Sequence, residues 1–239
     1  MFTTSKIDLL IYLISLTLII FCTGCDTNNS DTNNNQSVKE NVDHAKDESL
    51  AGNVENGKSL FATCIVCHGD KGQGLKALNA PALTNQNAWY LERQLANFKS
   101  GIRGNDPEDM NSFQMAAIAK TLNNNQAIKD VVAYTKTLPG TSTEKTIEGD
   151  VEKGKNYYNM ICGACHGPGA KGNESLNSPK LTGINDWYLL TQFQNFKEGK
   201  RGSHANDQYG AQMKDMATSL PDDQSVKDVV AYIQSLQSE

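Results

Sequence analysis

The feature that most constrains this chain is an internal repeat with a period of 98 residues. Cys64 and Cys162 lie 98 residues apart, and the same offset continues without a gap to the segment KDVVAY at 129–134 and 227–232. A period of this kind indicates one structural unit that has been duplicated. Between those ends the offset matches Pro81 with Pro179, Leu83 with Leu181, Trp89 with Trp187, Tyr90 with Tyr188, Phe98 with Phe196, Gly101 with Gly199, Arg103 with Arg201, Met115 with Met213, and Leu122 with Leu220.

Each copy carries the motif C-x-x-C-H near its start, at 64–68 and at 162–166. On a helical turn, residues three apart share a face, so both thiols reach the two vinyl groups of one porphyrin. The following histidine is then carried beneath the ring, where its imidazole can bind iron. C-x-x-C-H is the attachment motif of c-type haem. We therefore expect two covalent haem c groups, attached through Cys64, Cys67, Cys162 and Cys165, with iron bound by His68 and His166.

A haem held by one histidine needs a sixth iron ligand or keeps an open position. The thioether of methionine is a soft ligand that raises the reduction potential of cytochromes c. Met115 and Met213 are matched by the repeat, whereas Met216 aligns with Ile118, so the first two are the expected ligands. Met216 is the alternative in the second copy, and His204 is a more distant one.

Zinc is the rival interpretation of a C-x-x-C pair. A structural zinc site needs four Cys or His ligands at compact spacing, but each pair here has one adjacent histidine and no second pair for about 95 residues. A thioredoxin-like dithiol would need a strand–turn–helix context, which the pattern lacks. The other cysteines, Cys22 and Cys25, lie near the N-terminus and leave no pair for a disulfide framework in the folded part.

Several other matched residues have readings that the sequence leaves open. Pro81 and Pro179 follow the motif histidine by thirteen residues and either supply a carbonyl that fixes the imidazole or form a plain turn. The aromatic pairs either pack against a haem or belong to an ordinary core. The arginines either pair with a haem propionate or lie exposed in a loop. The aromatic pairs are Trp89 with Tyr90 and Trp187 with Tyr188, and the arginines are Arg103 and Arg201.

The pattern of each copy is helical, with no strand-like alternation. Asn53 and Asp150 are expected N-caps of a first helix that leads into the motif. A second helix is expected over 88–100, with Gly101 as its C-cap, and a last helix over 126–138 and 225–236. The predicted fold class is all-α, as two tandem domains that each wrap a few helices around one haem.

The N-terminus reads as an export signal. Residues 9–22 form an apolar run of fourteen residues, which is shorter than the roughly 20 needed to span a bilayer and fits a signal peptide. Gly24-Cys25 after this run resembles a lipobox, so Cys25 is a candidate for lipidation; an uncleaved anchor and ordinary signal cleavage are the alternatives. The expected layout is a signal over 1–25, a disordered polar tether over 26–53, a domain over 54–138, a linker over 139–148 and a domain over 149–239.

Taken together, the motif, the loop proline, the late methionine and the closing helix resemble a class I cytochrome c, and two in tandem resemble the dihaem cytochrome c4 type. The resemblance covers residues 54–238. It implies the axial pairs His68 with Met115 and His166 with Met213, and a non-enzymatic electron carrier between respiratory complexes and terminal oxidases or reductases. The leader favours a carrier on the periplasmic side, tethered to the membrane through Cys25.

The charge of the chain and the duplication of its domain help to compare the electron-carrier function with other functions. A net charge of −5 gives no electrostatic footprint for nucleic acid. The first domain carries a small positive excess and the second a small negative one, so the two ends are expected to dock different redox partners. A dihaem peroxidase needs an iron with an exchangeable position and domains that are not simple copies. A cytochrome subunit fixed within an oxidase or dehydrogenase complex is the other alternative.

Overall fold

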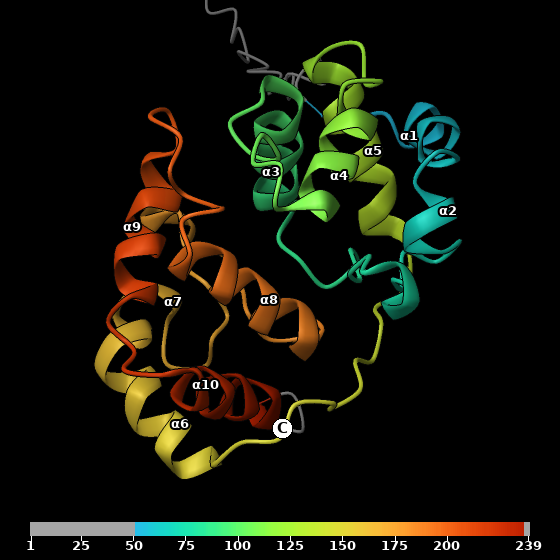
Figure 1. Ribbon diagram of the computed structural model, residues 1–239. Coiled ribbons are helices and arrows are strands. Elements are labelled where there is room, and N and C mark those ends of the chain that lie inside the picture. Colours follow the sequence, from blue (N-terminus) through green and yellow to red (C-terminus); the bar gives the residue numbers. More distant parts are fainter. Residues whose placement is uncertain (1–50, 237–239) are drawn as a thin grey trace, which may run out of the picture. The chain divides into compact units, whose positions relative to one another are not determined.

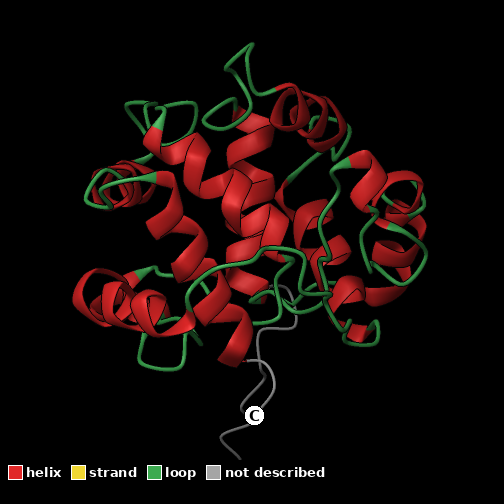
Figure 2. Ribbon diagram, turned by 60° about the horizontal axis from the view of Figure 1, so that its bottom comes forward, coloured by secondary structure: helices red, strands yellow, loops and turns green. Residues whose placement is uncertain are grey.

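The computed structural model describes residues 51–236, and this part is made of helices joined by loops (Figures 1 and 2). The predicted all-α class is confirmed; the only β pairings in the described part are two isolated bridges, Leu75 with Ala80 and Asn173 with Ser178. The predicted signal and nearly all of the tether lie outside the described residues. Within 51–236, no helix is both long and apolar enough to cross a membrane.

The two copies have matching helices. The first module contains α1 (Val54–Phe61), α2 (Ile65–His68), the 3₁₀ turn η2 (Lys76–Leu78), α3 (Ala88–Ser100), α4 (Met110–Ala119) and α5 (Asn125–Thr137). The second contains α6 (Val151–Tyr157), the π-helix η3 (Tyr158–Cys162), α7 (Gly163–His166), the 3₁₀ turn η4 (Glu174–Leu176), α8 (Asp186–Lys197), α9 (Gln208–Ala217) and α10 (Asp223–Ser235). Residues 139–150, which join the modules, contain neither helix nor strand.

The first and last helices of each module cross in close contact. A Cβ added to Gly57 would lie 1.9 Å from the carbonyl oxygen of Asp130, and one on Gly154 would lie 1.9 Å from that of Asp228. The aspartates also receive the start of the first helix, because Asn53 N–H donates to Asp130 Oδ1 at 2.8 Å. Asp150 N–H donates to Asp228 Oδ1 at 2.9 Å in the same way. These contacts explain why the KDVVAY segment is identical in both copies.

Each module has its own apolar core around this crossing. In the first, Phe61, Leu122, Ile128, Val131 and Val132 form the buried cluster. In the second, Tyr158, Leu220, Val226, Val229 and Ile233 form it. The ring of Phe61 meets that of Tyr134 edge-on at 5.3 Å, and Tyr158 meets Tyr232 at 5.4 Å. Each of these two core clusters is therefore made of residues from one module only.

Most predicted helix ends are confirmed. Asn53 and Asp150 cap the first helices by accepting the N–H groups of Asn56 and Lys153, and the helix over 88–100 ends at Gly101, whose φ is +77°. Two helices were not predicted. The α4 and α9 helices carry the candidate methionines, and they begin where Asp109 and Asp207 accept backbone N–H groups three residues ahead.

A one-residue insertion distinguishes the second module. The first helix starts at Val54 and Val151, which are 97 residues apart, whereas the motif cysteines are 98 apart. The extra residue lies in the π-helix Tyr158–Cys162. A π-helical turn accommodates one additional residue inside a helix without breaking it. The core position of Phe61 is therefore filled by Tyr158, and the motif keeps its place.

Candidate functional site

Both C-x-x-C-H motifs lie on single helical turns. The short helices α2 and α7 follow Cys64 and Cys162 directly, and each ends at the motif histidine. In each turn the first cysteine is half-buried and the second is exposed, and none of the four forms a disulfide. Two thiols and an imidazole are thus presented by one turn in each module. This is the arrangement that the motif predicts for attachment of one porphyrin.

The first cysteine of each motif has a raised thiol pKa. Burial, together with the neighbouring Cys67, raises the pKa of Cys64 to about 11, and burial with Cys165 raises that of Cys162 to about 12. A neutral thiol binds metal weakly, because the thiolate is the ligand. Within residues 51–236 no cluster of three or more His, Cys, Asp or Glu side chains is placed to hold a metal ion. The described residues therefore contain no ligand cluster of the kind that the zinc interpretation requires.

The motif histidines are oriented by the matched prolines. Nδ1 of His68 lies 2.8 Å from the carbonyl oxygen of Pro81, and Nδ1 of His166 lies 2.8 Å from that of Pro179. A carbonyl oxygen only accepts hydrogen bonds, so Nδ1 carries the proton and Nε2 keeps its lone pair. The carbonyl role predicted for the prolines is confirmed. Each ring has one nitrogen fixed and the other available to iron.

Burial keeps these imidazoles neutral. It lowers the pKa of His68 and of His166, and the hydrogen bond to the proline carbonyl only partly offsets it. A neutral imidazole is the form that binds metal. The protein therefore presents each histidine in the right protonation state and tautomer before any ligand arrives.

The loop between histidine and proline is alike in both modules. Gly74 N–H donates to the carbonyl of His68 at 2.8 Å, and Gly172 N–H donates to that of His166 at 2.9 Å. A Cβ on Gly74, at φ +80°, would lie 2.5 Å from the backbone nitrogen of Ala82. Glycine is thus required for the loop to fold back and bring Pro81 to His68. The thirteen-residue spacing that the sequence showed is the length of this loop.

The candidate methionines lie on equivalent helices. Met115 is half-buried on α4 beside the cluster of Phe98, Ala116 and Ala119, and Met213 is half-buried on α9. Met216, the alternative in the second module, is 43% exposed. Its counterpart in the first module, Ile118, is exposed as well. The other alternative, His204, uses its Nδ1 to accept the N–H of Asn206.

The arginines whose place the sequence left open are buried. Arg103 donates a hydrogen bond to Tyr188 of the second module, and Arg201 donates one to Tyr90 of the first. Among the described buried side chains, only Nε of Arg103 lacks a hydrogen-bond partner. An orphaned buried donor of this kind fits a structure that binds an acidic group there. Trp89 and Trp187 each pack edge-on against the tyrosine that follows them.

The residues present fit haem c. Two thiols, one neutral imidazole with a free Nε2 and a half-buried thioether occur in each module, and Nε of Arg103 is a donor that is free to bind a carboxylate.

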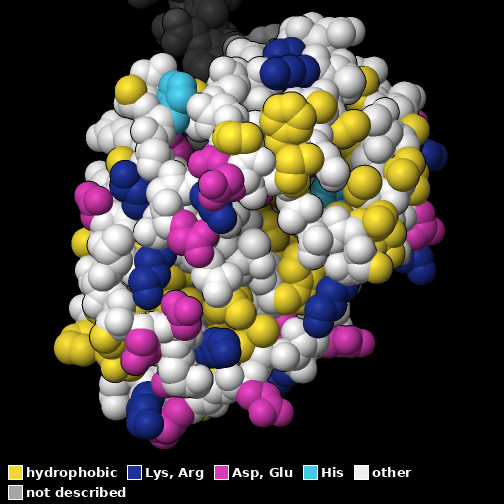
Figure 3. Space-filling model, viewed as in Figure 1, with side chains coloured by type: hydrophobic (Ala, Val, Ile, Leu, Met, Phe, Trp, Pro, Cys, Tyr) yellow, Lys and Arg dark blue, Asp and Glu magenta, His cyan; other side chains and the backbone are white. Residues whose placement is uncertain are grey.

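The apolar side chains around the turns differ between the modules, because Ile65 and Val66 in the first motif are replaced by Gly163 and Ala164 in the second. Val66 is 72% exposed. Figure 3 shows hydrophobic side chains gathered over the first module on the face in view.

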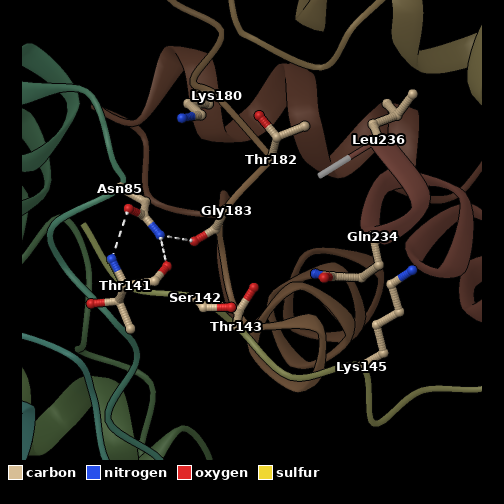
Figure 4. Close-up of a pocket in the computed structure, with 10 residues that line it drawn as sticks. All are labelled: Asn85, Thr141, Ser142, Thr143, Lys145, Lys180, Thr182, Gly183, Gln234 and Leu236. Carbon is tan, nitrogen blue, oxygen red and sulfur yellow. Dashed lines mark hydrogen bonds between the residues drawn. The ribbon is translucent and has the colours of Figure 1, made fainter. Parts of the chain in front are cut away.

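A separate hollow of about 390 Å³ lies beside the linker (Figure 4). Asn85 forms one wall, where its amide donates to the carbonyl of Gly183 at 2.8 Å and accepts the N–H of Thr141. Its lining includes none of the motif cysteines, histidines or candidate methionines. The other lining residues are Ser142, Thr143, Lys145, Lys180, Thr182, Gln234 and Leu236. This hollow is not the cofactor site.

Comparison with known proteins agrees with this geometry. The family model for cytochrome c matches the chain twice, over residues 54–139 and 151–237. Cytochrome c4 of Stutzerimonas stutzeri is 31% identical over 195 residues, which cover 78% of this chain and 90% of that protein. Cytochrome c4 of Pseudomonas aeruginosa is 41% identical over 196 residues, with the same two coverages of 78% and 90%.

A solved structure is similar over the same region. The crystal structure of reduced recombinant cytochrome c4 from Pseudomonas stutzeri matches with a TM-score of 0.59 and 27% sequence identity. The match covers 77% of this chain and 98% of that one. The similarity therefore extends over both modules and not over one motif alone.

Proposed function

This chain belongs to the cytochrome c family and, within it, to the tandem dihaem cytochromes of the c4 type, and we propose that it carries electrons in a bacterial respiratory chain. It is an electron carrier rather than an enzyme. Two covalently attached haem c groups, one in each module, supply reversible one-electron exchange between ferrous and ferric iron. The redox partners belong to the general class of respiratory donors and terminal oxidases or reductases.

The observation that carries this proposal is the equivalence of the two histidines. Each donates its Nδ1–H to a proline carbonyl at 2.8 Å and keeps Nε2 free. His68 and His166 would hold the iron in their modules, and the haem would be attached through Cys64 and Cys67 in the first module and through Cys162 and Cys165 in the second. A fixed ring changes little in geometry between two oxidation states, and this keeps reorganisation small during electron exchange.

Met115 in the first module and Met213 in the second would supply the second protein ligand of each iron. Both are half-buried at matched places on α4 and α9. If a histidine and a methionine both hold each iron, no position on the iron would remain for a substrate. The thioether ligand also favours the ferrous state and a high potential. The more exposed Met216 is less suited to this role.

The protein acts on the periplasmic side of the membrane, and we propose that it is anchored there by a lipid on Cys25. The support is the apolar run of residues 9–22 followed by Gly24-Cys25. Mass spectrometry of the N-terminal peptide tests this directly, since a diacylglyceryl-cysteine is expected at Cys25. Release of a Cys25→Ser variant from membranes into the soluble fraction is the second expected result. An unmodified N-terminus at another residue contradicts the anchor.

Absorption spectroscopy of the oxidised protein tests the haem ligands. The wild type should show two low-spin haems with methionine-to-iron charge-transfer absorption. Met115→Ala and Met213→Ala should each remove half of that band, whereas Met216→Ala should leave it unchanged. A high-spin haem in the wild type that turns over peroxide overturns the electron-carrier proposal and favours a dihaem peroxidase. Recovery only within a larger enzyme complex favours a fixed subunit.

A further inference from the structure

The hollow of about 390 Å³ beside the linker has a polar and positively charged lining. Lys145 of the linker and Lys180 of the second module both line it, and each carries an ammonium charge. Among the described lining residues none is Asp or Glu, and Leu236 is the one large apolar side chain. A cavity of this size is large enough for a small ligand. Its lining favours an anion over an apolar molecule.

A third lysine adds to the positive charge beside the hollow. Lys136 of α5 donates from Nζ to the carbonyl oxygens of Thr84 at 2.9 Å and Gln86 at 2.7 Å. Both acceptors are neutral, so these hydrogen bonds do not cancel the charge. Burial lowers the pKa of Lys136, and the charge of Lys180 lowers it further. The two like charges therefore repel each other, and an anion bound in the hollow would relieve this repulsion.

The hydroxyl of Thr182 lacks a partner that its counterpart has. Thr182 lines the hollow and is 8% exposed, and within residues 51–236 its hydroxyl makes no hydrogen bond. The equivalent residue of the first module, Thr84, is 7% exposed, and its hydroxyl lies 3.1 Å from that of Thr141. A largely buried hydroxyl is costly unless a bound group completes its hydrogen bonding. Thr182 therefore offers a donor to a ligand in the hollow.

Other lining residues are held in place by hydrogen bonds of their own. The amide of Asn85 donates to the carbonyl oxygens of Thr141 at 2.5 Å and Gly183 at 2.8 Å. Gln234 of α10 donates to the carbonyl oxygen of Ile184 at 2.8 Å. These bonds join the linker and the closing helix to the loop that carries Thr182. The hollow therefore has fixed walls rather than walls that a ligand must first order.

The positive lining is not a product of the repeat. The counterpart of Lys180 in the first module is Ala82, and the counterpart of Lys136 in the second module is Gln234. Lys145 lies in the linker, which occurs once. Each module thus folds without the charge that the other carries at the equivalent position. Because the shared fold does not require these lysines, their gathering at one hollow calls for another explanation.

We propose that this hollow binds a small anion with two linked oxyanion groups, such as a diphosphate. Figure 4 shows Lys180 and Lys145 at opposite ends of the lining, with Ser142 and Thr182 between them. Each ammonium group binds one oxyanion group through charge-assisted hydrogen bonds, and the hydroxyl of Thr182 donates to an oxygen between them. Lysine binds phosphate as a point charge, and the described lining contains no arginine fork of the kind that matches a carboxylate. The site is separate from both haem sites.

Isothermal titration calorimetry of the full-length dihaem protein with inorganic pyrophosphate, at constant ionic strength, tests this. The wild type should bind one pyrophosphate per chain, and orthophosphate, with one oxyanion group, should bind more weakly. Lys145→Gln and Lys180→Gln should each weaken pyrophosphate binding by roughly tenfold or more. Lys155→Gln removes the same charge from an exposed position outside the hollow and should bind like the wild type. Absence of binding by the wild type overturns the proposal, and so does an equal loss in Lys155→Gln.

Thr182→Val is an independent variant that keeps the shape of the side chain. Since the hydroxyl has no partner within the described residues, the variant should fold like the wild type and bind pyrophosphate about three- to tenfold more weakly. Thr84→Val is the matched control, because Thr84 does not line the hollow, and its affinity should be unchanged. Unchanged affinity in Thr182→Val overturns the proposal even if the lysine variants do not fold. Equal affinity for orthophosphate and pyrophosphate contradicts a ligand with two oxyanion groups.

The haem spectrum separates this proposal from the proposed function. The absorption spectrum should be the same with and without pyrophosphate, because the lining includes none of the haem-binding candidates. A protein with two His/Met haems that binds no pyrophosphate contradicts the anion site alone. A protein that binds pyrophosphate but has no His/Met haem contradicts the proposed function alone.

Discussion

The side-chain amide of Asn85 donates to the carbonyl oxygen of Gly183 at 2.8 Å, and these two residues hold the same place in the two repeats. A repeat that contacts itself at equivalent positions has a local two-fold relationship at that point. The same relationship appears where Ala82 N–H donates to Asn185 and its counterpart Lys180 N–H donates to Asn87. The interface is therefore built from one surface used twice.

The first prediction concerns Gly183. Its φ of +76° and its contact with Asn85, whose Cβ lies 3.0 Å from where an added Cβ would be, both disfavour a side chain. Gly101 is a matched control, since its φ is +77° and nothing lies within 4 Å of its added Cβ. Gly101→Ala should cost about 1–2 kcal/mol for the left-handed backbone. Gly183→Ala should cost about 1–3 kcal/mol more for the clash, measured by denaturant unfolding. Equal losses would show that Asn85 does not restrict the site.

The second prediction concerns the reciprocal asparagines. Asn185→Ala removes the acceptor of Ala82 N–H and should destabilise the protein by about 1–3 kcal/mol, because a partly buried donor is left unpaired. Hydrogen exchange of the Ala82 amide should become faster, and Asn87→Ala should do the same at Lys180. Asn185→Asp keeps an oxygen at the same place and serves as the control. Unchanged exchange at Ala82 in Asn185→Ala would contradict the hydrogen bond.

The third prediction concerns the helix crossing in the second module. Gly154→Ala would place a methyl group 1.9 Å from the carbonyl oxygen of Asp228, which is backbone and cannot move aside. The closest atom to a Cβ on Gly163 is 3.4 Å away, an ordinary contact. We expect Gly154→Ala to lower stability by at least about 3 kcal/mol and Gly163→Ala to change it by less than about 1 kcal/mol. Thermal unfolding followed by circular dichroism measures both, and similar midpoints for the two variants would refute the close crossing.

The fourth prediction concerns acid stability. Burial opposes ionisation of Asp130, but donors from Asn53, Asn56 and Gln126 outweigh it and lower the pKa of its carboxyl. A group whose pKa is lower when folded stabilises the protein above its unfolded pKa of about 3.9, and this stabilisation is lost as pH falls through the folded pKa. Wild type should therefore exceed Asp130→Asn in unfolding free energy at pH 7, and the gap should narrow near pH 3. Asp215→Asn, at an exposed position, is the control and should show no such gap.

The sequence predicts local features well because their causes are local. Asn53 caps α1 because its own side chain reaches the N–H of Asn56, and the thirteen-residue spacing to Pro81 is set by one loop. The helices α4 and α9 were missed, since Met110–Ala119 is short and lacks a continuous apolar stripe. The burial of Arg103 and Arg201 was also beyond reach. A repeat shows which residues are equivalent, but not that equivalent residues meet across an interface.

The last prediction concerns the π-helix of the second module. Tyr158–Cys162 contains one residue more than its counterpart, and Met160 within it is 73% exposed. Deleting Met160 should convert the segment to the register of the first module, with Tyr158 still in the core and Cys162 still on its turn. Ile161, which packs partly against the core, would move outward at a cost of about 1–2 kcal/mol. The variant should retain two haems by pyridine haemochrome assay and fold by circular dichroism. Deletion of Ala62 is the control, because the first module has no extra residue at this place, and this variant should lose one haem. Equal haem content in the two deletion variants would show that the π-helix does not accommodate the inserted residue.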